Sequence, residues 1–112
     1  MTSTSASPLY GNLNLLILSV LAHGPMHGLA VGRRIREMSG GDLQIEEGAL
    51  YPALHRLRRD GLIASRWGTS EQNRRARFYE LTKAGVSRLD REMATWQRHV
   101  RAMTRVIEPG SA

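Results

Sequence analysis

The chain has 112 residues, of which 41% are apolar and 23% are charged, and its net charge is +6. This composition excludes an intrinsically disordered chain, and the length suits one small domain. The absence of cysteine excludes disulfides and cysteine-ligated metals. The four histidines show no metal-ligand spacing, so we expect neither a metal nor a cofactor.

The basic residues are almost all arginine: Lys83 is the one lysine among sixteen Lys and Arg residues. Arginine presents a planar fork of N–H donors that fits phosphates and guanine edges. Together with the positive net charge, this favours a nucleic-acid partner. An arginine-rich genome would explain the Arg-to-Lys ratio but not the net charge.

We expect no secretory signal and no membrane-spanning segment in the first part of the sequence. Residues 1–8 lack the basic segment of a secretory signal. The apolar stretch at residues 13–22 is too short for the ~20 residues that cross a bilayer. We therefore expect a cytoplasmic, nucleoid-associated protein with no membrane partner. Residues 1–8 and 108–112 are expected to be flexible tails.

The first predicted helix lies at residues 13–21, where apolar side chains recur at the spacing of an amphipathic helix. Gly24-Pro25 ends it, and we expect His23 and His27, on either side of this turn, to make capping or turn hydrogen bonds. The predicted core face consists of Leu13, Leu16, Ile17, Val20 and Leu21.

A second helix is predicted at residues 27–39, because Gly40-Gly41 is a typical helix stop. Its expected core residues are Val31, Ile35 and Met38. The alternation of apolar and polar residues at 43–45 then predicts a short strand.

A third helix is predicted at residues 47–60. Pro52 falls in its first turns, where a missing N–H costs least, and Gly61 follows its end. Leu50, Leu54 and Leu57 face inward. The outward face consists of Ala49, Tyr51, Pro52, His55, Arg58 and Arg59.

The period of the apolar pattern then changes to two. Residues 63–67 and 77–81 alternate as strands do, which predicts a β-hairpin with a long tip at residues 68–76. Thr82 is a good N-cap and opens a last helix that reaches residue 107. This helix would be ~39 Å long, longer than the rest of the chain can cover.

The order of these elements predicts a mainly α fold with a small β-wing. It is the plan of a winged helix-turn-helix domain, at residues 9–81, followed by a long C-terminal dimerisation helix at 82–107. The third helix would be the recognition helix, and the hairpin would be the wing.

The outward face of the recognition helix is predicted to contact a major groove. The residues at its N-terminal end are small, and hydrogen-bonding side chains follow on the same face of the helix. The predicted contact residues are Ala49, Tyr51, Pro52, His55 and Arg59. A merely solvated helix face is an equally weighted alternative, and Glu46 and Glu47 oppose binding to phosphates.

The wing gives a stronger signal for DNA. Residues 66–77 hold four Arg and one Glu, a charge of +3, which is half the net charge of the chain. A basic tip beside a helix-turn-helix suits an anionic backbone, although a solvated turn is the alternative. The predicted wing contacts are Arg74, Arg75, Arg77 and Tyr79.

The last helix carries an unbroken heptad seam, which predicts a partner helix in a homodimer. The predicted dimer interface consists of Leu16, Val86, Leu89, Met93, Trp96, Val100 and Met103. Met93 and Trp96 could line a pocket for a small aromatic effector. The alternative, given more weight, is that Trp96 packs against the partner's first helix near Leu13 or Leu16.

Three segments resemble the PadR-like transcriptional regulators. GPMHG at residues 24–28 is similar to the opening of that family. GALYPALHRL at 48–57 with DGLI at 60–63 resembles its recognition helix, and RFYELTKAG at 77–85 resembles the end of its wing. The resemblance implies a winged-helix dimer, usually a repressor, that binds a short inverted repeat. The single C-terminal helix is similar to the smaller subfamily, and WGTSEQNRRA at 67–76 looks like a branch common in acidobacteria.

Two positions depart from the family pattern. Many members carry Gly-Tyr where this chain has Gly28-Leu29, so a contact by that tyrosine does not carry over. Arg58 replaces an acid that usually follows the recognition-helix leucine, which makes this helix more basic.

The function expected from these features is sequence-specific binding of double-stranded DNA by a homodimer that regulates transcription. We expect no enzyme activity, because no catalytic constellation is present. One alternative is a protein-interaction module that binds an acidic partner. Another is a nucleic-acid packaging protein, which would carry scattered Lys and no helix stripe.

Overall fold

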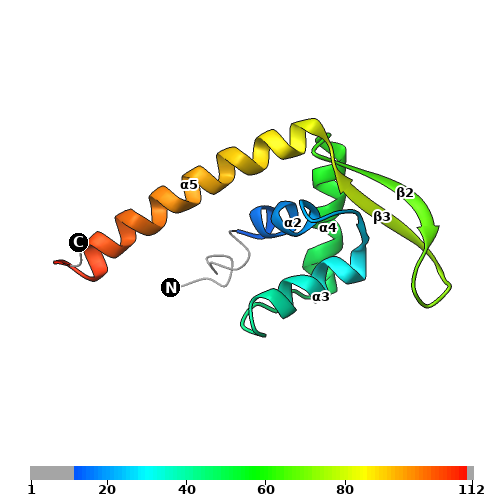
Figure 1. The fold of residues 1–112 in the computed structure, drawn as a ribbon, viewed down its shortest axis with the longest axis horizontal. Helices are drawn as coiled ribbons and strands as arrows, with labels where there is room; N and C mark the ends of the chain where they lie inside the picture. Colours follow the sequence, from blue (N-terminus) through cyan, green and yellow to red (C-terminus); the bar gives the residue numbers. More distant parts are fainter. Residues whose placement is uncertain (1–11, 111–112) are drawn as a thin grey trace.

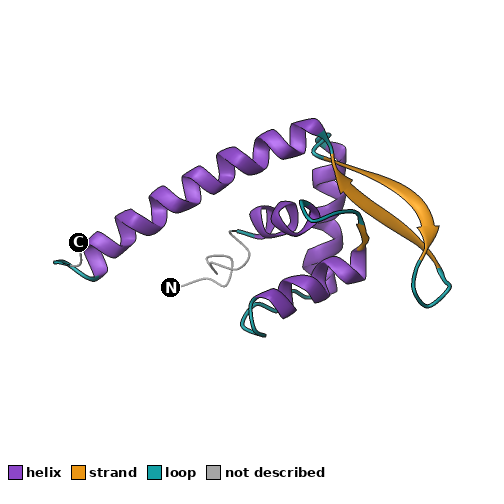
Figure 2. Ribbon diagram, viewed as in Figure 1, coloured by secondary structure: helices purple, strands orange, loops and turns teal. Residues whose placement is uncertain are grey.

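The computed structural model describes residues 12–110, which form four helices and a small antiparallel sheet that projects from the helical body (Figures 1 and 2). The elements in chain order are α2 (Leu13–Leu21), β1 (Met26–His27), α3 (Gly28–Met38), α4 (Glu47–Arg59), β2 (Ile63–Thr69), β3 (Arg75–Leu81) and α5 (Lys83–Ile107). The predicted N-terminal tail at 1–8 lies outside the described residues. The sheet order is β1-β3-β2, so the predicted winged helix-turn-helix fold is confirmed.

The core lies where α2, α3 and α4 meet the base of the sheet. Ile17, Val31 and Leu54 are completely buried there. Two elements leave this body in different directions: the β2–β3 hairpin projects on one side and α5 on the other (Figure 1). The longest dimension of the molecule is 53 Å. Of the described helices, none is both long and apolar enough to cross a bilayer.

Helix α3 begins and ends as the sequence predicts, with one error in its core face. The His27 Nδ1 accepts a hydrogen bond from the Ala30 N–H at 3.3 Å, which caps the helix. The predicted core residue Met38 is wrong, since it is 56% exposed. It is the last residue of α3, and more than half of its surface is open to solvent within the described chain.

The third strand of the sheet is not the predicted one. Residues 43–45 form no strand, and Met26–His27 pairs with β3 instead, with Met26 opposite Tyr79 and His27 opposite Phe78. Leu43 and Ile45 satisfy their apolar pattern by packing on the core without a partner strand. The Leu43 N–H donates to the Ser39 Oγ at 3.0 Å rather than to a ladder.

The wing strands are longer and the tip is shorter than predicted. Pairing extends to Thr69 opposite Arg75, which leaves residues 70–74 as the turn. The Ser70 N–H donates to the Arg74 oxygen at 2.8 Å, and Asn73 adopts a left-handed conformation with φ 60°. Asn tolerates that conformation well, which lets a compact tip close the hairpin.

Helix α5 begins at the base of the wing and runs past the body. The Thr82 Oγ1 accepts from the Gly85 N–H at 3.0 Å, which confirms Thr82 as the N-cap. Within α5, all of which is described, the buried residues are Gly85 and Leu89. The remainder of the helix, including its predicted seam, is largely exposed.

Candidate nucleic-acid interface

Helix α4 packs one side on the core and leaves the opposite side exposed. Leu50, Leu54 and Leu57 are buried. Of the predicted contact residues, Tyr51, Pro52, His55 and Arg59 are exposed and Ala49 is partly buried. The Arg59 Nε donates to the Asp60 Oδ1 at 3.2 Å, so part of its charge is already compensated. Tyr51 and His55 therefore form the open hydrogen-bonding stripe of this helix.

The Tyr51 ring is held against the first residue of α3. A Cβ atom added at Gly28 would lie 2.7 Å from the ring Cε1 and 3.0 Å from the hydroxyl oxygen, so only glycine fits there without moving the ring. Burial raises the pKa of Tyr51, and the nearby Glu47 and Tyr79 raise it further. The phenol consequently stays neutral and keeps its O–H as a donor.

We expect Gly28→Ala to displace the Tyr51 ring and to lower the Tyr51 pKa toward its ordinary value, because the ring would become more exposed. NMR titration of the tyrosine ring carbons measures this change. Gly48→Ala is the matched control, since a Cβ atom at Gly48 meets nothing within 4 Å. An unchanged Tyr51 pKa in Gly28→Ala would show that Gly28 does not set the ring position.

The arginines of the wing lie on two faces of the hairpin. Paired residues of an antiparallel ladder share a face, so Trp67, Arg77 and Arg75 lie on one side and Arg66 lies on the other. The Arg77 Nη1 donates to the Ser65 Oγ at 2.9 Å. The Arg66 Nε is 3.8 Å from the Glu80 Oε1. The first face is thus the more basic one.

Tyr79 is a correction to the predicted wing contacts. Its side chain is 8% exposed and belongs to the core. It sits on the central strand, opposite Met26 on one neighbour and Ser65 on the other, so it is covered where the wing joins the body. Alternation alone could not separate the buried base of this strand from its exposed end.

At the wing tip, the carboxylate of Glu71 lies near His27, just before α3. The sequence did not reveal this contact. The Glu71 Oε1 lies 3.5 Å from the buried His27 Nε2. This distance is long, and the Nε2 forms no hydrogen bond within the described residues, so the attraction is weak. The pKa of Glu71 is lowered, mainly by a hydrogen bond with its own backbone and then by His27.

Comparison with known proteins identifies the family. Residues 17–91 match the model of the transcriptional regulator PadR-like family. The chain belongs to the PadR-like family of transcriptional regulators. Its family and fold are therefore those of a DNA-binding transcription regulator.

Solved structures share the fold of this PadR-like chain. A transcriptional regulator from Clostridium thermocellum has a TM-score of 0.82 and 25% identity, covering 96% of this chain and 100% of that one. A PadR family regulator from Clostridium difficile has a TM-score of 0.76 and 26% identity, covering 87% and 99%. A PadR-like transcription factor from Bacteroides fragilis has a TM-score of 0.71 and 29% identity, covering 87% and 91%.

One related sequence is much longer. An uncharacterised 37.1 kDa protein of transposon Tn4556 from Streptomyces fradiae is 37% identical over 84 residues. The match covers 75% of this chain but 23% of that protein, so the PadR-like chain spans less than a quarter of its length.

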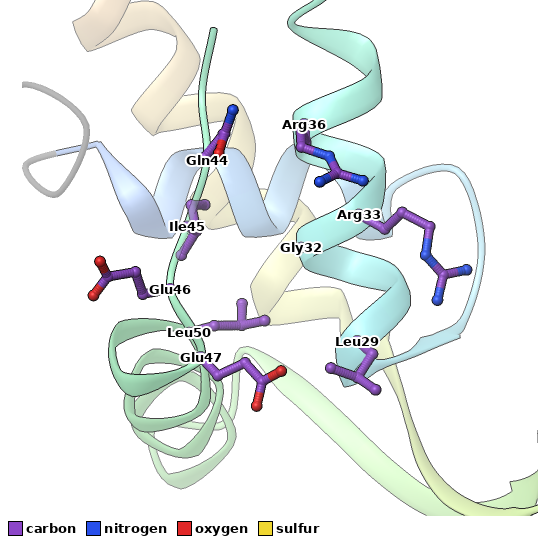
Figure 3. Close-up of a pocket in the computed structure, with 9 residues that line it drawn as sticks. All are labelled: Leu29, Gly32, Arg33, Arg36, Gln44, Ile45, Glu46, Glu47 and Leu50. Carbon is purple, nitrogen blue, oxygen red and sulfur yellow. The ribbon is translucent and has the colours of Figure 1, made fainter. Parts of the chain in front are cut away.

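A groove of about 480 Å³ lies between α3 and the start of α4 in this PadR-like chain (Figure 3). Arg33 and Arg36 line its α3 side, whereas Glu46 and Glu47 line its α4 side. The four charged groups do not converge on one point (Figure 3). The mixed charge makes this groove a poor site for phosphate.

A second groove, of about 470 Å³, lies between α2 and α5. It is lined by Asn12, Leu15, Leu16, Ser19, Leu43, Met93, Trp96 and Gln97. Trp96 is 40% exposed, and Met93 is similarly open to solvent. The two predicted effector residues therefore share an apolar groove with Leu16 of α2.

The other residues of the predicted dimer interface are mostly open. Val86, Val100 and Met103 are exposed large apolar side chains. Leu89 is buried by its own chain, and Leu16 is partly buried against the core. The exposed part of the seam therefore starts beyond Leu89, apart from Val86.

Proposed function

We propose that this transcription regulator represses its target by binding an inverted-repeat operator as a homodimer. Helix α4 would lie in the major groove, and the wing would neutralise phosphates of the backbone. The observation that carries the proposal is the arrangement of hydrogen-bonding side chains on the exposed side of α4 and of basic side chains on the projecting wing. Repression itself rests on the family resemblance.

The proposal assigns different tasks to the two elements. Tyr51 and His55, with Ala49, Pro52 and Arg59 around them, would fix the register and read base edges. Arg74, Arg75 and Arg77 would hold phosphates without reading sequence. Glu46 and Glu47 oppose phosphate, but they suit the positive end of the α4 dipole.

Dimerisation would join two copies of the winged domain, residues 9–81, through the helix at 82–107. Exposed apolar side chains that step along one helix face favour a partner helix. Operator binding also implies that the protein acts in the cytoplasm, where the nucleoid lies.

The test of the proposed function is binding to duplex DNA. We expect the wild type to bind a labelled mixed-sequence duplex with a steep salt dependence, and to select an inverted repeat from a random pool. Fluorescence anisotropy measures the binding. If neither duplex nor single-stranded DNA binds at low salt, the proposal fails. The alternative of a module for an acidic protein would then be favoured.

A small aromatic effector is a second proposal, favoured by the apolar groove that Met93 and Trp96 line. Trp supplies a large flat face, and Met adapts to varied ligands. We expect planar cationic or phenolic compounds to quench Trp96 fluorescence in a saturable way and to weaken DNA binding. Trp96→Phe is the control, because Trp67 also fluoresces.

If no compound gives a saturable change, and Trp96→Ala also abolishes the dimer, then Trp96 is a structural residue. It would then pack against α2 of the partner, near Leu13 or Leu16.

A further inference from the structure

Trp67 is a large aromatic side chain that is exposed to solvent. It is 53% exposed and lies in the outer half of β2, beyond the part of the sheet that packs on the core. More than half of this large side chain stays in water instead of being buried in the core. Its position therefore calls for a role on the surface of the wing.

Two guanidinium groups stack on this ring. The Arg75 Cζ lies 4.3 Å from the ring centroid, and the Arg77 Cζ lies 4.8 Å from it. Both distances are within the ~6 Å range of a cation–π interaction, for which Trp is the best aromatic partner. The hairpin register brings the three residues together, because Trp67 is opposite Arg77 and Thr69 is opposite Arg75.

The Trp67 ring holds two positive charges close together that would otherwise move apart. Both arginines extend from β3 on the same face, and like charges repel when they are close. The Trp67 ring attracts both of them, and the Ser65 Oγ fixes Arg77 through a hydrogen bond of 2.9 Å. The Arg77 Nη1 is used in this bond, and the other guanidinium nitrogens of the pair are the donors left for a phosphate.

We propose that Trp67 is the positioning residue of the wing: it holds Arg75 and Arg77 as a preformed pair for adjacent phosphates of duplex DNA. The inference rests on the proposed DNA-binding function and deepens it. An unrestrained arginine loses much rotamer freedom when it binds a phosphate. A pair already held on a rigid ring loses less, so binding is tighter without any additional charge.

The hairpin face that carries Arg75 and Arg77 continues toward α4, the proposed recognition helix. Tyr79 lies on this same face of the hairpin, nearer to the body. Helix α4 contacts β2, and Ile63 on this face is buried in the core, so the base of this face is close to α4. One DNA surface could therefore contact both α4 and the Trp67 platform.

The experiment is a mutant cycle on the binding of a labelled mixed-sequence duplex of about 30 base pairs, measured by anisotropy at several salt concentrations. We expect Trp67→Leu to weaken binding by about fivefold to tenfold, because two guanidinium groups must then lose their rotamer freedom on binding. The salt dependence should not change, because no charge is removed. Trp67→Phe keeps an aromatic face and should restore most of the affinity.

The decisive comparison uses the Arg75→Ala/Arg77→Ala background. If Trp67 acts through these arginines, Trp67→Leu has no further effect there. If it weakens binding equally in both backgrounds, Trp67 contacts DNA by itself and the proposal is overturned. An unchanged affinity of the single variant would also overturn it. If the wild type does not bind duplex at all, the proposed function fails instead.

A measurement without DNA guards against a wing that fails to fold in Trp67→Leu. In the free wild type, stacking places the side-chain protons of Arg75 and Arg77 over the indole, so NMR should find them shifted upfield. The Arg66 protons on the opposite face are the control and should have ordinary shifts. Ordinary shifts for Arg75 and Arg77 would exclude the platform.

Discussion

The double variant Met93→Glu/Val100→Glu is expected to be monomeric and to bind duplex DNA at least a hundredfold more weakly than the wild type. Both side chains lie on the exposed seam of α5. A carboxylate buried in a helix–helix interface without a partner is strongly unfavourable. Two linked DNA-binding units gain ~10²–10⁴ in avidity over one unit, and the monomer loses that gain.

Light scattering coupled to gel filtration measures the oligomeric state of this variant. The matched control is Ala94→Glu/Ala102→Glu, which adds the same charge at exposed α5 positions away from the seam. The control should remain dimeric. A soluble, folded dimer of Met93→Glu/Val100→Glu would show that α5 does not join the protomers. In the wild-type dimer, the two α4 helices should contact half-sites about 34–36 Å apart.

Helices were predictable from the sequence because their apolar spacing reports their own packing. Ile17, Val31 and Leu54 fall on the expected inward faces and are completely buried. Met38 follows the same spacing but is exposed, because a periodic pattern does not tell where the neighbouring helices end. The exposed seam after Leu89 follows from a length argument: a helix that outruns its own domain cannot be covered by it.

Strand pairing was harder to predict, because it depends on contacts between distant segments. Leu43 and Ile45 alternate as a strand does, whereas Met26–His27 is too short to show any period. Met26–His27 forms the ladder because the turn after α2 places these two residues beside the free edge of β3. Nothing in the local sequence of either segment encodes that choice.

The candidate DNA interface was predicted in composition but not in geometry. The positive wing and the outward stripe of α4 follow from charge and helical spacing. The Trp67 stack depends on the hairpin register, and a tip at residues 68–76 would have left Trp67 at the end of its strand. Two further contacts join different elements: Gly28 packs against Tyr51, and Glu71 lies near His27. Spacing along the sequence does not reveal contacts of this kind.

Removing the basic side chains of the wing is expected to flatten the salt dependence of DNA binding. Each phosphate contact contributes about 0.9 to the slope of log K against log salt. Arg75→Ala should therefore lower the slope by about 1.8 in a dimer, and Arg74→Ala/Arg75→Ala/Arg77→Ala by about 5. At low salt the triple variant should lose most of its affinity for every sequence.

Arg66→Ala is the matched control for this series. It removes the same charge from the same hairpin, but Arg66 lies on the opposite face and faces Glu80 at 3.8 Å. Its slope should stay close to that of the wild type. Anisotropy with the selected operator and a scrambled duplex separates the two possible roles of the wing. If Arg75→Ala changed the preference between these duplexes while the slope stayed the same, the wing would read bases rather than hold phosphates.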